Sequence, residues 1–160
     1  GDLVIFQLIN QNSIEKNPKI FVNSPLENTP LHIAASLGYV GIAKIILQHV
    51  DDKNPVSDDS YTPLHFAAQK GHLHMCRLIL DNTIDNNPKT VQDKTPLHEA
   101  VESGHLEVFK LLIEKVEEKN PKDRQGSTLL HIAANNGNLQ FCQLIVEYIN
   151  DNHPFDNLGM

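Results

Sequence analysis

One short motif recurs along this chain at a fixed interval, and it constrains the fold more than any other feature. Thr-Pro-Leu-His begins at Thr29, Thr62 and Thr95, and the related Thr-Leu-Leu-His begins at Thr128, so the motif returns every 33 residues. A fixed period of this size is typical of solenoids, in which each unit buries its apolar face only against its neighbours. The sequence therefore predicts a stack of similar units without a single central core.

Each repeat contains the signals of two short helices. The threonine is suited to cap the first helix, and the proline suits the first helical position, where it costs no hydrogen bond. A glycine at position 38, 71, 104 or 137 is expected to end this helix. Second helices are predicted over 42–47, 73–80, 106–113 and 139–146, before the chain turns toward the next threonine.

The motif and its 33-residue period resemble the ankyrin repeat, and the resemblance extends over the whole chain. It implies an all-α solenoid of stacked helix-turn-helix units joined by hairpin-like loops. We predict a single array that belongs to a longer one. Its predicted parts are 1–23 (second half of a preceding repeat and a linker), 24–56, 57–89, 90–122 and 123–155 (full repeats), and 156–160 (start of a further repeat).

The chain departs from the family pattern at several turns. The glycine of the hairpin turn is present as Gly126 but is replaced by Ser60 and Asp93, so those turns must be built differently or carry strain. The glycine that usually follows the second helix is also replaced, and these helices are expected to continue for one or two residues. The first hairpin is four residues longer than the later ones, and it is expected to expose Phe21.

The composition indicates which kinds of partner and which cellular compartment suit the chain. The net charge is −7, which disfavours nucleic acid or an anionic membrane as the main partner. No apolar run approaches the roughly 18 residues that span a bilayer. Cys76 and Cys142 lie two periods apart, at roughly 20 Å by helix packing, which is too far for a disulfide. With no Asn-X-Ser/Thr site in the chain, an intracellular and cytoplasmic location is predicted.

The histidines do not indicate a metal site or an enzyme. The four motif histidines occur once per repeat, about 10 Å apart, whereas zinc ligands lie about 2.1 Å from the ion. The resemblance implies that they form hydrogen bonds near the helix start instead. No phosphate-binding loop or catalytic triad pattern is present, so no cofactor, metal or catalysis is expected. The resemblance also suggests Asn54, Asn87 and Asn120 as targets of hydroxylation, but the proline that follows each of them disfavours this modification.

The resemblance implies that hairpin tips and the first helices form a concave surface that binds a protein or peptide. Residues at these positions differ between repeats, whereas the motif does not. The predicted binding residues are Phe21, Asp58, Asp59, Tyr61, Gln69, Lys70, Gln92, Lys94, Glu102, Arg124, Gln125, Asn135 and Asn136. Tyr61 is the foremost candidate, expected to be an exposed aromatic beside Lys94 and Lys70.

Two other functions remain open at this point. The chain could be a structural spacer within a longer ankyrin array, or the docking arm of a larger enzyme, channel or effector. No obligate homo-oligomer is predicted.

Overall fold

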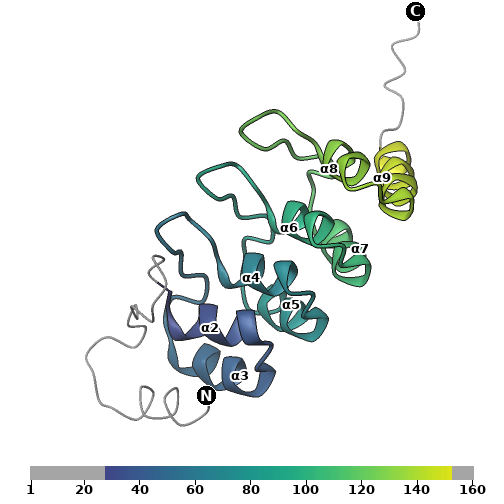
Figure 1. The fold of residues 1–160 in the computed structure, drawn as a ribbon. Coiled ribbons are helices and arrows are strands. Elements are labelled where there is room, and N and C mark those ends of the chain that lie inside the picture. Colours follow the sequence, from purple (N-terminus) through teal and green to yellow (C-terminus); the bar gives the residue numbers. More distant parts are fainter. Residues whose placement is uncertain (1–27, 153–160) are drawn as a thin grey trace, which may run out of the picture.

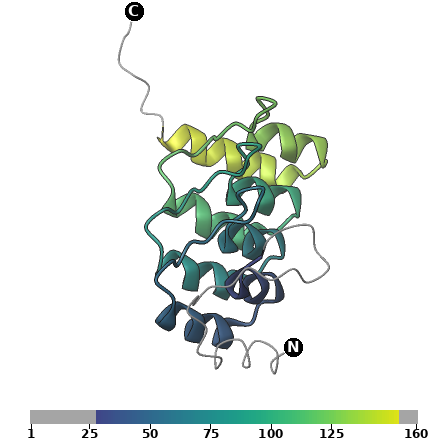
Figure 2. The same cartoon turned by 90° about the vertical axis from the view of Figure 1, so that its left-hand side faces the viewer.

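A computed structural model describes residues 28–152 as eight helices in two stacked layers (Figures 1 and 2). The first helices of the repeats are α2 (Pro30–Leu37), α4 (Pro63–Gln69), α6 (Pro96–Glu102) and α8 (Leu129–Asn135). The second helices are α3 (Val40–His49), α5 (Leu73–Leu80), α7 (Leu106–Lys115) and α9 (Leu139–Asn152). The predicted half-repeat at the start, the long first hairpin and the last eight residues lie outside the described residues.

The motif histidines His32 and His65 connect the first helices of their repeats to the following hairpins. The Nδ1 atom of His65 accepts the backbone N–H of Thr62 at 3.1 Å, which forms part of a capping box. Its Nε2 atom donates to the carbonyl of Lys94 at 3.1 Å. A ring that accepts at Nδ1 and donates at Nε2 is neutral. Burial accordingly lowers the pKa of His65 to about 4.

A second row of histidines joins consecutive repeats beside the glycines that end the first helices. His72 donates from Nε2 to the carbonyl of Ser36 at 3.1 Å, and His105 makes the equivalent bond at 3.0 Å. A Cβ atom on Gly71 would lie 2.5 Å from the His105 ring, so glycine is required there for space as well as for its φ of +72°. The fourth repeat has Asn138 in place of this histidine, and the row stops.

Each hairpin in the described part of the chain contains a tight turn closed by its own backbone. In the second repeat, the carbonyl of Ser57 accepts the N–H of Ser60 at 2.9 Å, and the N–H of Ser57 donates to the carbonyl of Tyr61 at 2.9 Å. The fourth residue of each turn has a positive φ, which is 61° at Ser60, 58° at Asp93 and 82° at Gly126. Ser60 and Asp93 therefore keep the conformation of the glycine that they replace, and they carry the strain expected from the sequence.

The second helices differ in where they end. Helices α3 and α7 continue two residues past the predicted ends, whereas α5 stops at Leu80, and there the expected extension is wrong. Polar side chains end α5, because Asn82 donates from Nδ2 to the carbonyl of Leu78 at 2.8 Å, and Thr83 donates from Oγ1 to Ile79 at 3.1 Å. Helix α9 extends to Asn152.

The core is a continuous stripe between the two layers. It contains the motif leucines and alanines of the first three repeats with the inner residues of the second helices. At the last repeat, the rings of Phe109 and Phe141 meet edge to face, with centroids 5.3 Å apart. His131 and Ala134 are exposed there, although the equivalent residues of the earlier repeats are buried. Ala134 is exposed because no described repeat covers α8.

Candidate functional site

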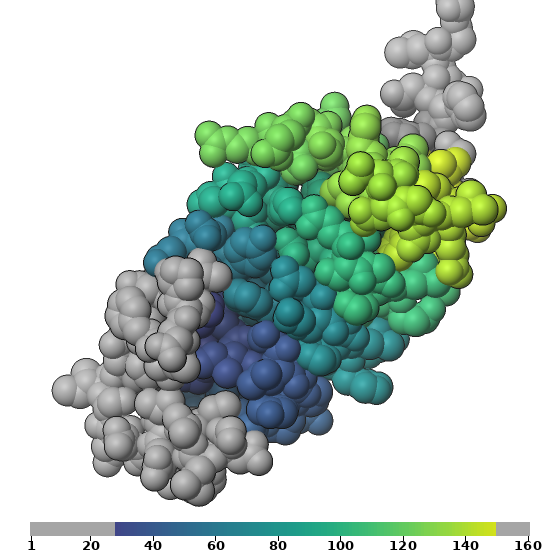
Figure 3. All heavy atoms as spheres, in the orientation of Figure 1, coloured from purple at the N-terminus to yellow at the C-terminus, as the bar shows by residue number. Residues whose placement is uncertain are grey.

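The hairpin tips form a single edge along the first-helix side of the array. Figure 3 shows the hairpins side by side at this edge. Val91 donates its N–H to the carbonyl of Asp59 at 3.1 Å, and Arg124 donates to the carbonyl of Gln92 at 2.8 Å. The backbone thus joins consecutive tips. The predicted tip residues that are exposed on it are Asp58, Asp59, Gln92, Arg124 and Gln125.

Tyr61 is placed differently from its prediction. It is half-buried, and its ring lies against His65 and Phe66, with centroids 5.3 and 5.6 Å apart. Its hydroxyl donates to Oε1 of Glu99 at 3.1 Å. Burial, reinforced by the negative charge of Glu99, raises the pKa of the Tyr61 hydroxyl. The expectation of an exposed aromatic is therefore wrong, because a buried carboxylate one repeat away draws the hydroxyl inward.

Glu99 is a residue of this surface that the sequence analysis missed. Only 2% of it is exposed, and its second oxygen, Oε2, accepts a bond from Nε2 of Gln69 at 3.0 Å. Burial raises the pKa of Glu99, and the hydrogen bond from Tyr61 opposes that shift. A sequence signal existed, since the other three repeats have an apolar residue at this motif position. Glu99 therefore binds two predicted surface residues, Tyr61 and Gln69, to the third repeat.

Lys94 and Glu102 form an ion pair between a hairpin and a first helix. The Nζ atom of Lys94 donates to both carboxylate oxygens of Glu102 at 2.6 and 2.8 Å. Both side chains are partly exposed, so the pair contributes at most about 1 kcal/mol to stability. The structure thus brings together two residues that were predicted separately. Lys70, predicted to lie beside Tyr61, is exposed at the end of α4.

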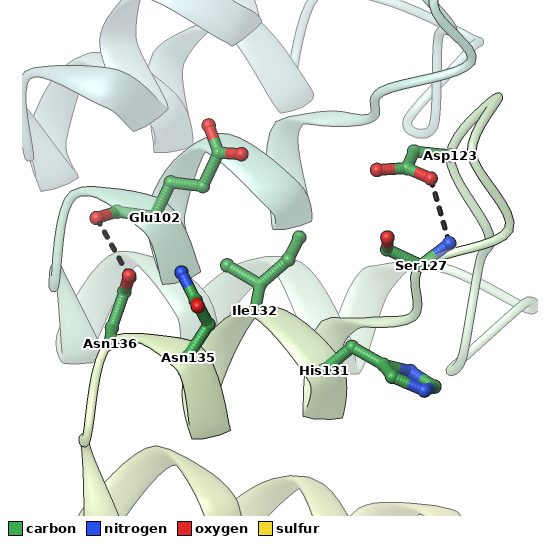
Figure 4. A pocket seen from close by; sticks show the side chains of 7 residues that line it. All are labelled: Glu102, Asp123, Ser127, His131, Ile132, Asn135 and Asn136. Carbon is green, nitrogen blue, oxygen red and sulfur yellow. Dashed lines mark hydrogen bonds between the residues drawn. The ribbon is translucent and has the colours of Figure 1, made fainter.

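A hollow of about 490 Å³ lies between α6, α8 and the fourth hairpin (Figure 4). Its lining residues are Glu102, Asp123, Ser127, His131, Ile132, Asn135 and Asn136. Three of them were predicted as binding residues, and Asn136 also donates from Nδ2 to the carbonyl of Glu102 at 3.3 Å. Asp123 and Ile132 were not predicted as binding residues, because their proximity depends on how the third and fourth repeats pack. Phe21 lies outside the described residues.

The junction beneath this hollow is looser than the junctions before it. Helix α8 packs less closely on α6 than α6 packs on α4. His98 is completely buried, and its ring interacts with the backbone of Ser127, but its Nε2 atom forms no hydrogen bond of normal geometry there. The equivalent atoms of His32 and His65 donate to hairpin carbonyls. Burial lowers the pKa of His98, and the carboxylate of Asp123 opposes that shift. The fourth repeat therefore stands slightly apart from the third.

Further features of the described residues bear on metal binding, thiol chemistry and membrane insertion. Within residues 28–152, no three His, Cys, Asp or Glu side chains lie close enough to share a metal ion. Cys76 and Cys142 are free thiols, and burial raises the pKa of Cys76 to about 12, which makes it a poor nucleophile. None of the helices in the described part has the length and apolar character needed to cross a membrane.

The family of the chain follows from its repeats and from a direct comparison. A family model described as ankyrin repeats (three copies) matches residues 1–90 and again residues 87–156. The chain therefore belongs to the ankyrin-repeat family. Proteins of this family are generally non-catalytic and generally act as protein–protein interaction modules. A search of curated proteins finds none that matches this chain.

Proposed function

We propose that this chain is a docking array, which binds a segment of a protein partner along the concave surface between its hairpin tips and first helices. The observation that carries the proposal is the open hollow of about 490 Å³ on this surface. Apart from the motif residue His131, its lining residues differ between the repeats, while the recurring motif forms the frame of the fold. Such a division suits a surface that can be varied without loss of the scaffold.

The hairpin edge also favours binding. Backbone hydrogen bonds hold consecutive tips together in the absence of a partner. They run from the N–H of Val91 to the carbonyl of Asp59, and from the N–H of Arg124 to the carbonyl of Gln92. A preorganised surface loses little conformational entropy on association, so more of the contact energy appears as affinity. We therefore expect a partner to contact several tips at once.

The proposal is tested by capture of a partner with a matched pair of variants. One variant carries Arg124→Ala and Gln125→Ala at an exposed hairpin tip, and the other carries Arg77→Ala and Gln143→Ala on the exposed sides of second helices. Each removes one arginine and one glutamine, so charge and composition change equally. Circular dichroism confirms that both remain folded, and quantitative mass spectrometry compares the proteins that they retain.

We expect a partner that the wild-type array and the second-helix variant retain and that the tip variant loses. Equal retention by both variants would place binding on another surface and contradict the proposal. Capture of nothing by any of the three would favour a structural spacer instead.

A further inference from the structure

The hollow between α6 and α8 lies where larger side chains fill the equivalent places of the earlier repeats. Ser127 occupies the repeat position of Tyr61 and Lys94, and Ile132 occupies that of Phe66. In the second repeat, the rings of Tyr61 and Phe66 pack together at 5.6 Å. In the fourth repeat, the short Ser127 and the aliphatic Ile132 leave that space open, and both line the hollow.

The third repeat shows how a basic side chain sits on this surface. Lys94, at the position of Ser127, extends its ammonium to both carboxylate oxygens of Glu102 on α6. The residues lining the hollow include two carboxylates, from Glu102 and Asp123, but no lysine or arginine. The fourth repeat thus offers an acidic group, Asp123, without a lysine or arginine beside it in the hollow.

The carboxylate of Asp123 is held in a fixed orientation. Its Oδ1 atom accepts the backbone N–H groups of Gln125 at 3.0 Å and Ser127 at 2.8 Å. Figure 4 shows the other oxygen directed across the hollow toward the side of Glu102. Lys94 compensates the charge of Glu102, so the negative charge of Asp123 remains for a ligand. A preoriented acceptor of this kind favours a donor with fixed geometry.

The floor of the hollow is apolar. Ile132, which is 9% exposed, lies between the two acidic sides in Figure 4. A long basic side chain can pack its methylene groups on such a floor while its charged head reaches the carboxylates. The planar guanidinium of arginine has five N–H donors in a rigid fork, and it matches a carboxylate with two parallel bonds. Arginine therefore fits the shape and the charge of the hollow together.

We propose that this hollow is a pocket for an arginine side chain, presented by a basic segment of the protein partner. The proposal rests on the docking function above and specifies the chemistry of the partner. The net charge of −7 favours the approach of such a segment from a distance.

The probes are three synthetic peptides that differ at one central residue in a Gly-Ser background, with arginine, lysine or the uncharged analogue citrulline. Binding to the full chain is followed by amide chemical shifts in two-dimensional NMR spectra. We expect the arginine peptide to shift the amides of Ser127, Ile132 and Asn135, and to bind more tightly than the lysine peptide. The citrulline peptide is expected to cause no shift.

Two variants and a matched control locate the site. Asp123→Asn keeps an oxygen for the two backbone bonds but removes the charge, and Ser127→Tyr fills the hollow as Tyr61 fills the equivalent place. Asp123→Asn is expected to weaken binding of the arginine peptide by about tenfold, as the loss of one charge-assisted hydrogen bond implies. Ser127→Tyr is expected to weaken it at least as much, because the ring occupies the space of the ligand. Asp85→Asn is the control, because Asp85 likewise accepts a backbone N–H in a turn but does not line the hollow.

Several results would overturn the arginine pocket. One is that the arginine peptide causes no amide shift at millimolar concentration. Another is that the lysine or citrulline peptide binds as tightly as the arginine peptide. A third is that Asp123→Asn binds the arginine peptide as tightly as the wild type. If Ser127→Tyr does not fold, Asp123→Asn decides alone. Because the capture experiment uses other residues and a natural partner, it can succeed while the peptides fail. That combination would leave the docking function standing and remove only the arginine pocket.

Discussion

Glu99 shows how one residue can reorganise the surface of a repeat. It stands where the neighbouring repeats have Phe66 and Ile132, and it is almost completely buried. A buried carboxylate is costly unless donors surround it, and here Tyr61 and Gln69 supply one bond to each oxygen. Side chains that could otherwise contact a partner are thereby used to satisfy a charge.

The hydrogen bond between Tyr61 and Glu99 is expected to contribute measurably to stability. Tyr61→Phe keeps the ring against His65 and Phe66 but leaves the buried carboxylate with one donor fewer. We expect the free energy of unfolding to fall by about 2 kcal/mol, as for other bonds to charged groups. Urea denaturation of the wild type and the variant measures it. An unchanged midpoint would mean that water replaces the hydroxyl at no cost.

Two equivalent glycines offer a controlled comparison of backbone strain and space. Gly104→Ala meets no atom within 4 Å, so its cost is the positive φ of 76° alone, about 1 kcal/mol. Gly71→Ala adds a clash with the His105 ring, which must move and give up its bond to the Gln69 carbonyl. We expect a total loss of about 2 kcal/mol or more there. Thermal unfolding of the two variants tests the difference, and equal losses would contradict it.

The hairpins are the elements in which the chain departs most from a regular repeat. Ser60 and Asp93 adopt the left-handed conformation that Gly126 adopts in the last hairpin. Hydrogen bonds within each turn and between adjacent tips hold them there, so the fold tolerates the strain. The element keeps its shape because its backbone bonds do not depend on the residue at that position.

Relief of this strain should stabilise the array. Ser60→Gly is expected to raise the free energy of unfolding by about 0.5–1 kcal/mol, since the strain removed exceeds the added flexibility of the unfolded chain. Gly126→Ser is the converse change and should lower it by a similar amount. Differential scanning calorimetry on both variants provides the comparison. A loss of stability in Ser60→Gly would show that the turn is not strained.

At the scale of the whole molecule, the repeats are not joined equally. The first three are connected through motif histidines, through the row formed by His72 and His105, and through backbone bonds between tips. At the fourth repeat, His98 forms no hydrogen bond of normal geometry at Nε2, and Asn138 interrupts the row. The bonds that remain run from the Arg124 N–H to Gln92 and from Asn136 to the Glu102 carbonyl. The hollow opens where these connections are fewest.

The buried histidines predict that the whole array loses stability in mild acid. In the unfolded chain His65 binds a proton near pH 6.5, whereas the folded state resists protonation until about pH 4. Between these values the unfolded state binds more protons, so stability falls as the pH decreases, by about 3 kcal/mol for His65 alone. His98, whose pKa is also lowered by burial, acts in the same direction. Chemical denaturation between pH 7 and pH 4 measures the loss.

Glu99 supplies the control for this pH dependence. Its raised pKa means that the folded state binds a proton more readily than the unfolded state, so acid stabilises the array through this group. Glu99→Gln removes the opposing effect, and we expect the variant to lose stability more steeply as the pH falls. A variant with a shallower profile than the wild type would contradict this sign.

The sequence by itself determined the stack of helix pairs, because each repeat encodes its own caps and turns. Thr62, His65 and Gly71 act within one unit or on the next one, so their spacing alone predicts their roles. Most of the binding positions could be named in the same way, from their place in the repeat. The partner of Tyr61 could not, since Glu99 is 38 residues away and belongs to another helix.

Only the tertiary structure decided where the surface is hollow. The space between α6 and α8 depends on the combined sizes of Ser127 and Ile132 and on how far the fourth repeat stands from the third. Such distances result from packing across an interface and leave no periodic signal in the chain. The carboxylates of Glu102 and Asp123 come from different repeats for the same reason. Local bonding therefore decides the architecture, and packing between repeats decides the site.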